Sequence, residues 1–214
     1  MKHSKSLVAL SIAAALGLGS AVAQADVLTA SDATFGSFDR SSGNRSLLIV
    51  GGDQGHVKHV DINIHFAKCD DPSLGSTEPA IGTRCTGTGF SFDREVVFRL
   101  SSPGGAHTVS LVEQDSWGGQ TPGAGVVSMT FDMGGAAFPG GPTTGTFRPV
   151  GNLDDFLGDD PNGTWNLFIQ DTVGADRLDY WQSTLEVTVP EPASLALLGL
   201  GLAGLGFARR AVKK

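Results

Sequence analysis

The chain has 214 residues, of which 30 are glycine, 17% are charged and 40% are hydrophobic. This length suits one domain with additional segments, the hydrophobic content excludes wholesale disorder, and the lack of a three-residue glycine period excludes a collagen-like chain. The formal net charge of -7 argues against nucleic acid as a partner.

The N-terminal segment has the pattern of a secretory signal peptide. Two lysines precede an apolar stretch over residues 7–22, and residues 23–25 supply the small-x-small pattern that a signal peptidase accepts. We expect a signal-peptide helix over residues 1–25, with cleavage between Ala25 and Asp26. The alternative is an uncleaved anchor helix.

Residues 26–188 contain many short strand patterns and no sustained helical period. Val60–Phe66 alternates apolar and polar residues, which is typical of a strand with one buried face, whereas Leu47–Val50 is a continuous apolar run that favours a buried strand. Further strands are expected at residues 96–100, 109–112, 126–131, 165–169 and 185–189. Turns rich in glycine and proline separate these segments, which favours an all-β sandwich or barrel.

The polar face of the expected strand at residues 60–66 carries histidines but no catalytic constellation. His59 and His65 lie six residues apart, too far to hold one ion together on an extended strand. No phosphate-cradling loop or dinucleotide fingerprint occurs, because the glycines stand in turns between strands. We therefore expect a protein that is not an enzyme.

Two cysteines, Cys69 and Cys85, lie in a segment rich in Asp, Pro, Ser, Gly and Thr. In an oxidising compartment such a pair predicts a disulfide, and closing a loop of this size adds about 3 kcal/mol in the chain-entropy description. A metal site would need further thiols or a histidine at ligand spacing.

The three tryptophans divide into two expected environments. Trp165 shares one face of a strand with other apolar residues, and with Trp181 it offers a large apolar surface for a core between two sheets. Trp117 stands among polar residues and glycines at the start of a glycine-rich stretch, residues 118–145, which we expect to be a long surface loop around one strand. We therefore expect Trp117 to be exposed and available to a ligand.

The C-terminal segment, residues 189–214, combines three ordered features. Pro190, Glu191 and Pro192 are followed by an apolar run over residues 195–207 and then by a cluster of arginines and lysines. A helix over residues 193–208 would rise about 24 Å, slightly short of a hydrocarbon core of about 30 Å. We expect a short transmembrane helix whose basic tail stays cytoplasmic, so that the part between the two hydrophobic segments is exported.

These features resemble the PEP-CTERM sorting signal of Gram-negative bacteria that make extracellular polysaccharide. The resemblance implies transient anchoring in the inner membrane, cleavage near the motif by an exosortase, and release or attachment at the cell surface. The alternative is an ordinary single-span anchor.

The part between the two terminal segments is strongly acidic. Residues 26–189 hold 21 of the 22 acidic residues and 9 of the 15 basic ones, a formal charge of -12. Such a surface suits calcium, whose ligands are hard oxygens, although solubility alone also accounts for it.

A set of motifs within residues 45–188 resembles the P domain, or Homo B domain, that follows the catalytic domain in proprotein convertases and many bacterial subtilases. The motifs are LSSPGG at 100–105, GTFRP at 145–149, LDDFLG at 153–158, NGTWNLFIQD at 162–171 and LDYW at 178–181. The resemblance implies a jelly-roll-like β-sandwich over residues 26–188. It also implies a calcium site of the kind some members carry, for which Asp171, Asp176 and Glu95 are the candidates; the alternative is that these carboxylates are simply solvated.

Taken together, these patterns predict a non-catalytic exported surface or matrix protein. Signal peptidase and exosortase are the expected processing enzymes, and extracellular polysaccharide is the expected ligand. The alternative, from the P-domain resemblance, is an accessory module that binds or stabilises a secreted subtilisin-like protease.

Overall fold

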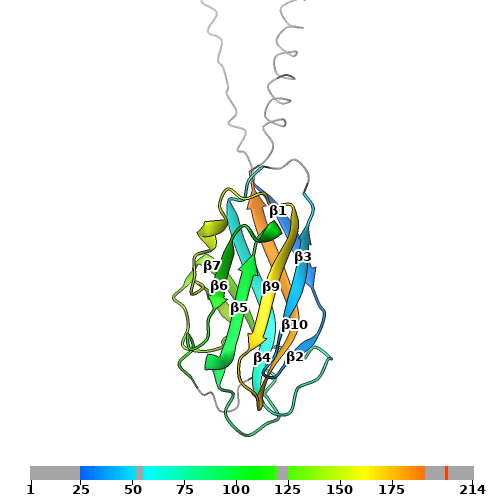
Figure 1. Ribbon diagram of the computed structural model, residues 1–214, viewed down its shortest axis with the longest axis vertical. Coiled ribbons are helices and arrows are strands. Elements are labelled where there is room, and N and C mark those ends of the chain that lie inside the picture. The colour runs from blue at the N-terminus through cyan, green and yellow to red at the C-terminus, as the bar shows by residue number, and fades with distance from the viewer. Residues whose placement is uncertain (1–24, 52–54, 120–124, 191–200, 202–214) are drawn as a thin grey trace, which may run out of the picture.

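Two β-sheets pack face to face in the computed structural model, which describes residues 25–51, 55–119, 125–190 and 201 (Figure 1). The expectation of an all-β sandwich is confirmed. The expected signal-peptide and transmembrane helices, together with Glu191 and Pro192, lie outside the described residues. Within the described part of the chain, no helix has the length and hydrophobicity needed to cross a membrane.

The larger sheet contains six strands and carries the most N-terminal and most C-terminal strands side by side. Its order is β1-β10-β4-β7-β8, with β2 also pairing with β10. The bounds are β1 Asp26–Asp32, β2 Gly36–Phe38, β4 His59–Asp70, β7 Val127–Ala136, β8 Gly145–Phe147 and β10 Asp176–Val189. All pairings are antiparallel except that between β7 and β8.

The smaller sheet contains four antiparallel strands in the order β3-β9-β5-β6. Their bounds are β3 Ser42–Ile49, β5 Val96–Ser101, β6 Thr108–Val112 and β9 Gly163–Asp171. Three short 3-10 helices, η1 Asp93–Glu95, η2 Pro103–Gly105 and η3 Leu153–Phe156, lie in the connections of the described residues. The chain crosses repeatedly between the two sheets, so residues distant in sequence meet in the interior.

The core between the sheets follows from the two-residue period of the strands. On β4 the interior residues are Val60, Ile62, Ile64 and Phe66, and on β9 they are Trp165, Leu167 and Ile169, all buried. Trp165 is fully buried, as expected, with its ring edge-on to Phe156 at 5.0 Å between centroids. Its indole Nε1 donates a hydrogen bond to the Pro161 carbonyl at 2.9 Å.

The strand expected at residues 47–50 is present, but it is buried on one face only. Residues 47–49 end β3, where Leu47 and Ile49 are buried and Leu48 is 61% exposed, and Val50, which follows the strand, is 79% exposed. The strand has one face against the core and one face toward solvent, so alternate residues of an apolar run point outward.

Trp181 is buried, as expected, but it does not lie between the sheets. A register shift in the pairing of β10 with β4 occurs between Tyr180 and Gln182 and places Trp181 on the outer face of the larger sheet. There it packs with Ala67, Cys69 and Val126 in a second, smaller cluster. The extra residue of such a bulge reverses the side to which its neighbours point, so the prediction of a core between the sheets built on Trp181 is wrong.

The disulfide between Cys69 and Cys85 is confirmed, with a Cα–Cα distance of 5.5 Å. It closes a loop over the outer face of the larger sheet and covers Trp181, whose Nε1 donates to the Gly75 carbonyl at 3.0 Å. The buried carboxylate of Asp179 fixes the start of this loop, because it accepts hydrogen bonds from the Ser73 hydroxyl and the Leu74 N–H.

Candidate functional site

Trp117, the predicted ligand contact, is fully buried, so that prediction is wrong. The indole stacks between the rings of Phe66 and Phe138, with centroid distances of 6.1 and 6.0 Å. A tight turn after β6, in which the Ser116 hydroxyl donates to the Glu113 carbonyl at 2.6 Å, folds the side chain inward. The neighbouring polar residues face solvent, whereas the large apolar ring fills the core. Burying the indole removes far more apolar surface from water than burying the polar side chains beside it would.

An open hollow lies where the disulfide loop meets the glycine-rich stretch. Its volume is about 350 Å³, and it is lined by Ile81, Gly82, Arg84, Gly125, Val126, Val127, Pro142, Thr143 and Thr144. A backbone bridge between Arg84 and Gly125 joins the two segments that form it. Ile81 is 55% exposed and offers an apolar surface beside a guanidinium and two hydroxyls. The sequence predicted the glycine-rich stretch as a surface loop but not the contribution of the disulfide loop to the hollow.

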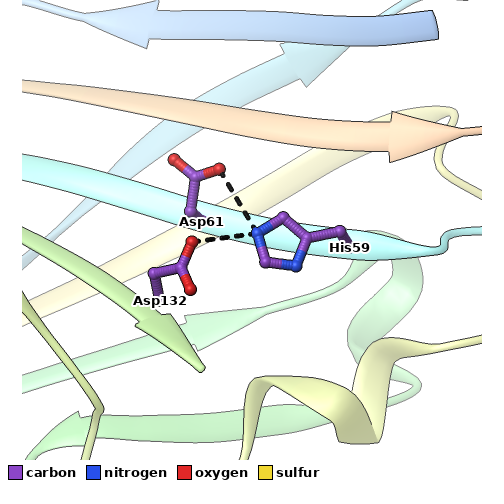
Figure 2. A group of neighbouring side chains, drawn as sticks. All are labelled: His59, Asp61 and Asp132. Atoms are coloured by element: carbon purple, nitrogen blue, oxygen red, sulfur yellow. Dashed lines mark hydrogen bonds and ion pairs between the residues drawn. The ribbon is translucent and has the colours of Figure 1, made fainter. Parts of the chain in front are cut away.

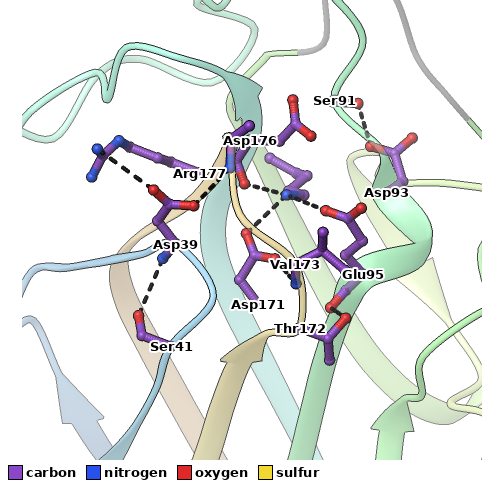
Figure 3. A network of polar contacts seen from close by, with 12 residues as sticks. Asp39, Ser41, Ser91, Asp93, Glu95, Asp171, Thr172, Val173, Asp176 and Arg177 are labelled. Carbon is purple, nitrogen blue, oxygen red and sulfur yellow. Dashed lines mark hydrogen bonds and ion pairs between the residues drawn. The ribbon is translucent and has the colours of Figure 1, made fainter.

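The three predicted calcium ligands do converge, but an ammonium group occupies the position of the cation (Figure 3). The Nζ of Lys68 lies 2.8 Å from Asp171 Oδ2 and 3.2 Å from Glu95 Oε2. It also donates to the backbone carbonyl of Asp176. Asp176 thus contributes its main-chain carbonyl oxygen to Lys68 rather than its carboxylate. The lysine therefore supplies the positive charge that the prediction assigned to calcium.

Lys68 and Asp171 come from opposite sheets. Lys68 continues the interior side of β4, two residues beyond Phe66, and Asp171 continues the interior side of β9, two residues beyond Ile169. Both side chains are fully buried, and that of Glu95 is 8% exposed. The two-residue period of each strand could have predicted that these charged groups meet, since both partners follow directly from a row of core residues.

The electrostatics of this group reflect its burial. Desolvation by burial raises the pKa of Asp171 to about 6, although the hydrogen bond and charge of Lys68 oppose the shift. Burial, followed by the charges of Glu95 and other carboxylates, likewise raises the pKa of Asp176 to about 6, again against the opposing charge of Lys68. One ammonium thus faces several carboxylates in a site from which water is largely removed.

A second polar group lies on the outer face of the larger sheet (Figure 2). The Nε2 of His59 is 3.0 Å from Asp132 Oδ2 and 3.8 Å from Asp61 Oδ2, and the ligand atoms of the three residues lie within 4.8 Å of one another. Pairing of Ile62 with Phe131 brings Asp61 and Asp132 alongside each other. Two carboxylates and an imidazole form a donor set that divalent cations accept, but the same atoms also satisfy one another as ion pairs.

The sequence correctly placed His59 on the polar face of its strand, where Asp61 also lies, and missed Asp132, which strand pairing adds from β7. Desolvation by burial raises the pKa of Asp61 to about 6, with Glu186 adding to the shift and His59 opposing it. His65, expected to face solvent, is only 11% exposed in its side chain, because it lies against Trp181 and pairs with Glu78 at 2.5 Å.

Comparison with protein families matches residues 188–210 to the PEP-CTERM protein-sorting motif. The match begins in the last two residues of β10, so the motif follows directly on the sandwich. The chain is therefore an exported, surface-sorted protein of the kind that exosortase processes in Gram-negative bacteria.

Comparison with curated proteins gives no match. Among solved structures, the chain is similar to the crystal structure of FLHE, with a TM-score of 0.37 and 10% sequence identity over 78% of this chain and 98% of that chain. These comparisons do not show the P-domain family, and they do not support the calcium site that was expected from that resemblance.

Proposed function

We propose that the protein is a non-catalytic surface or matrix module that associates with extracellular polysaccharide after export. The sorting motif at the end of β10 carries this proposal, because it directs the attached sandwich to the cell surface. The jelly-roll-like sandwich is the folded part delivered there, and its rigid strands would present the connecting loops to the matrix.

The hollow around Arg84 is the proposed contact surface. It combines the exposed apolar side chain of Ile81 with the hydroxyls of Thr143 and Thr144, and sugars offer both apolar C–H faces and hydroxyl groups to such a surface. Arg84 supplies a positive charge in a part of the chain whose formal charge is -12, so it would favour acidic sugars at this position.

The contacts of His107, which lies beside the buried Ser102, support a non-catalytic role. His107 Nδ1 pairs with Asp159 at 2.9 Å, while the Ser102 hydroxyl accepts a hydrogen bond from the backbone N–H of His107. A serine hydrolase needs the serine hydroxyl bonded to the imidazole itself. The alternative role beside a secreted protease depends on the P-domain resemblance, which the comparisons do not show.

Retention of the mature protein on a column of the host's purified extracellular polysaccharide tests the proposal. We expect Arg84→Ala to elute earlier than the unaltered protein, whereas Arg148→Ala, which removes the same charge from an exposed position outside the hollow, should elute with it. Equal elution of the two variants, or no retention of the unaltered protein, would contradict the proposal.

A further inference from the structure

We propose that Lys68 and Asp171 form an intramolecular isopeptide bond that joins the two sheets, with Glu95 as the catalytic residue that moves the protons. The inference is independent of polysaccharide binding. It depends on three buried side chains whose chemistry and spacing suit amide formation: an amine, a carboxyl group and a second carboxyl group in contact with the amine.

The reacting groups already touch. Lys68 Nζ lies 2.8 Å from Asp171 Oδ2, the oxygen bonded to the Cγ atom that Nζ would attack. It also lies 3.2 Å from Glu95 Oε2. The other carboxyl oxygen, Asp171 Oδ1, accepts a hydrogen bond from the Val173 N–H at 3.3 Å. Preorganisation of this kind replaces an encounter between separate reactants with a contact held by the fold.

Strand pairing holds Glu95 in this position. Its backbone carbonyl accepts hydrogen bonds from both the N–H and the hydroxyl of Thr172, each at 3.1 Å. Val96, the first residue of β5, pairs with Asp171 on β9, so Glu95 and Asp171 extend from adjacent strands. The carboxylate of Glu95 therefore reaches the amine from the smaller sheet, beside the group to be attacked.

The reaction is a condensation that needs no external reactant. A proton passes from the Lys68 ammonium to the Asp171 carboxylate, which leaves a neutral amine beside a carboxylic acid. The nitrogen lone pair then attacks Cγ of Asp171, while the Val173 N–H stabilises the negative charge that develops on Oδ1. Glu95 accepts a proton from the nitrogen and delivers it to Oδ2. One C–N bond forms, one C–O bond breaks, a water molecule leaves, and no atom is oxidised or reduced.

Burial favours the neutral forms that this reaction requires. Removal from water disfavours separated charges, and desolvation raises the pKa of the Asp171 carboxyl group to about 6. The amide product carries no charge, so the bond would relieve the burial of an ammonium and a carboxylate within the protein. Apolar residues often stabilise a core at least as well as a buried ion pair does, so stability alone gives little reason for a lysine at this position.

The bond would lie at one end of the sandwich. Asp26 and Val189 are paired where β1 meets the end of β10, whereas Lys68 is paired with Leu178, near the start of β10. Figure 1 shows the two ends of β10 at opposite ends of the sandwich. The sheets would thus be tied covalently far from the point at which the sorting motif begins. Such a tie suits a module that is exposed outside the cell to proteases and to mechanical load.

Intact-mass measurement of the mature protein, purified from its producing host, then reduced and denatured, tests the proposal. We expect the unaltered protein to be lighter than its sequence requires by one water molecule. Glu95→Gln, which keeps the size of the side chain but removes the proton acceptor, and Lys68→Arg, which keeps the charge but removes the amine, should both have the full mass of their chains. Proteolysis followed by tandem mass spectrometry should find a branched peptide joining β4 to β9 in the unaltered protein.

A full-mass unaltered protein would overturn the proposal, as would the same loss of water in Lys68→Arg. If Lys68→Arg does not accumulate, the peptide map of the unaltered protein decides the matter, because unlinked peptides containing Lys68 and Asp171 would be incompatible with the bond. Reduction before the measurement separates this bond from the disulfide, which reduction opens and which accounts for two hydrogen atoms.

Discussion

Replacing each of two buried tryptophans by phenylalanine should have clearly different effects on stability. Trp117 and Trp165 are both fully buried and both pack against aromatic rings. They differ in one respect: Trp165 Nε1 donates to the Pro161 carbonyl, whereas Trp117 Nε1 has no hydrogen-bond partner among the described residues.

The difference in cost follows from the hydrogen bond. Each change replaces a bicyclic indole by a smaller single ring and leaves a small cavity, which destabilises the fold. In Trp165→Phe the Pro161 carbonyl also loses its donor, and an unsatisfied buried polar group costs about 1–3 kcal/mol. In Trp117→Phe the change instead removes an unsatisfied N–H, which offsets part of the cavity cost. We expect Trp165→Phe to lower the free energy of unfolding by about 2 kcal/mol more than Trp117→Phe does.

Urea denaturation of the disulfide-bonded protein, followed by far-UV circular dichroism, measures both free energies without using tryptophan fluorescence. The slopes of the unfolding curves should be equal, so that a shift in midpoint reports stability alone. A loss in Trp117→Phe as large as that in Trp165→Phe would refute this reasoning and would mean that the Trp117 N–H has a partner.

Three further predictions concern the outer face of the larger sheet. Replacing Cys69 and Cys85 by serine should lower the free energy of unfolding by about 3 kcal/mol, measured by urea denaturation; no change would contradict a stabilising disulfide. Trp181→Ala should lower the free energy of unfolding by about 3–5 kcal/mol. Combined with the loss of the disulfide, the total loss should be smaller than the sum of the two separate losses, because both changes act on the same loop. A total equal to that sum would contradict the contact between Trp181 and the loop. The pKa of Asp61 is about 6 in the folded protein and 3.8 for an ordinary exposed aspartate, so the free energy of unfolding should fall as pH rises between these values and stay constant above them. In buffer with a chelator, the free energy of unfolding of Asp61→Asn should not fall with pH in this range, and it should be about 1–3 kcal/mol higher than that of the unaltered protein at pH 8. Denaturation at several pH values measures both effects. If the variant keeps the same pH dependence, another group causes it.

The fold class was predictable because it depends on a repeated local signal. Strand patterns such as Val60–Phe66 alternate over their whole length, and glycine or proline turns bound them, so the all-β sandwich follows without long-range information. The disulfide was predictable from the export signal and the two cysteines. The side of the sheet on which Trp181 lies was not, because a bulge beside Tyr180 reverses the alternation and nothing in the local pattern marks it.

The candidate sites show where composition misleads. Trp117 stands among polar residues, yet the turn after β6 directs its ring into the core, which depends on a space left by distant strands. We expected Glu95 and Asp171 to meet around a cation, and they do. The cation is the ammonium group of Lys68, which lies two residues beyond Phe66 on the interior side of β4. Asp132 was missed because pairing between β4 and β7, not sequence spacing, brings it to His59.

Export and sorting of this sandwich form the central claim, and both chain ends of the mature protein test it most directly. Terminal peptides of the protein isolated from its native host should begin at Asp26 and end close to Pro190–Pro192, since signal peptidase and exosortase remove what lies outside. A mature protein that keeps the hydrophobic segment and basic tail beyond Pro192 would contradict it.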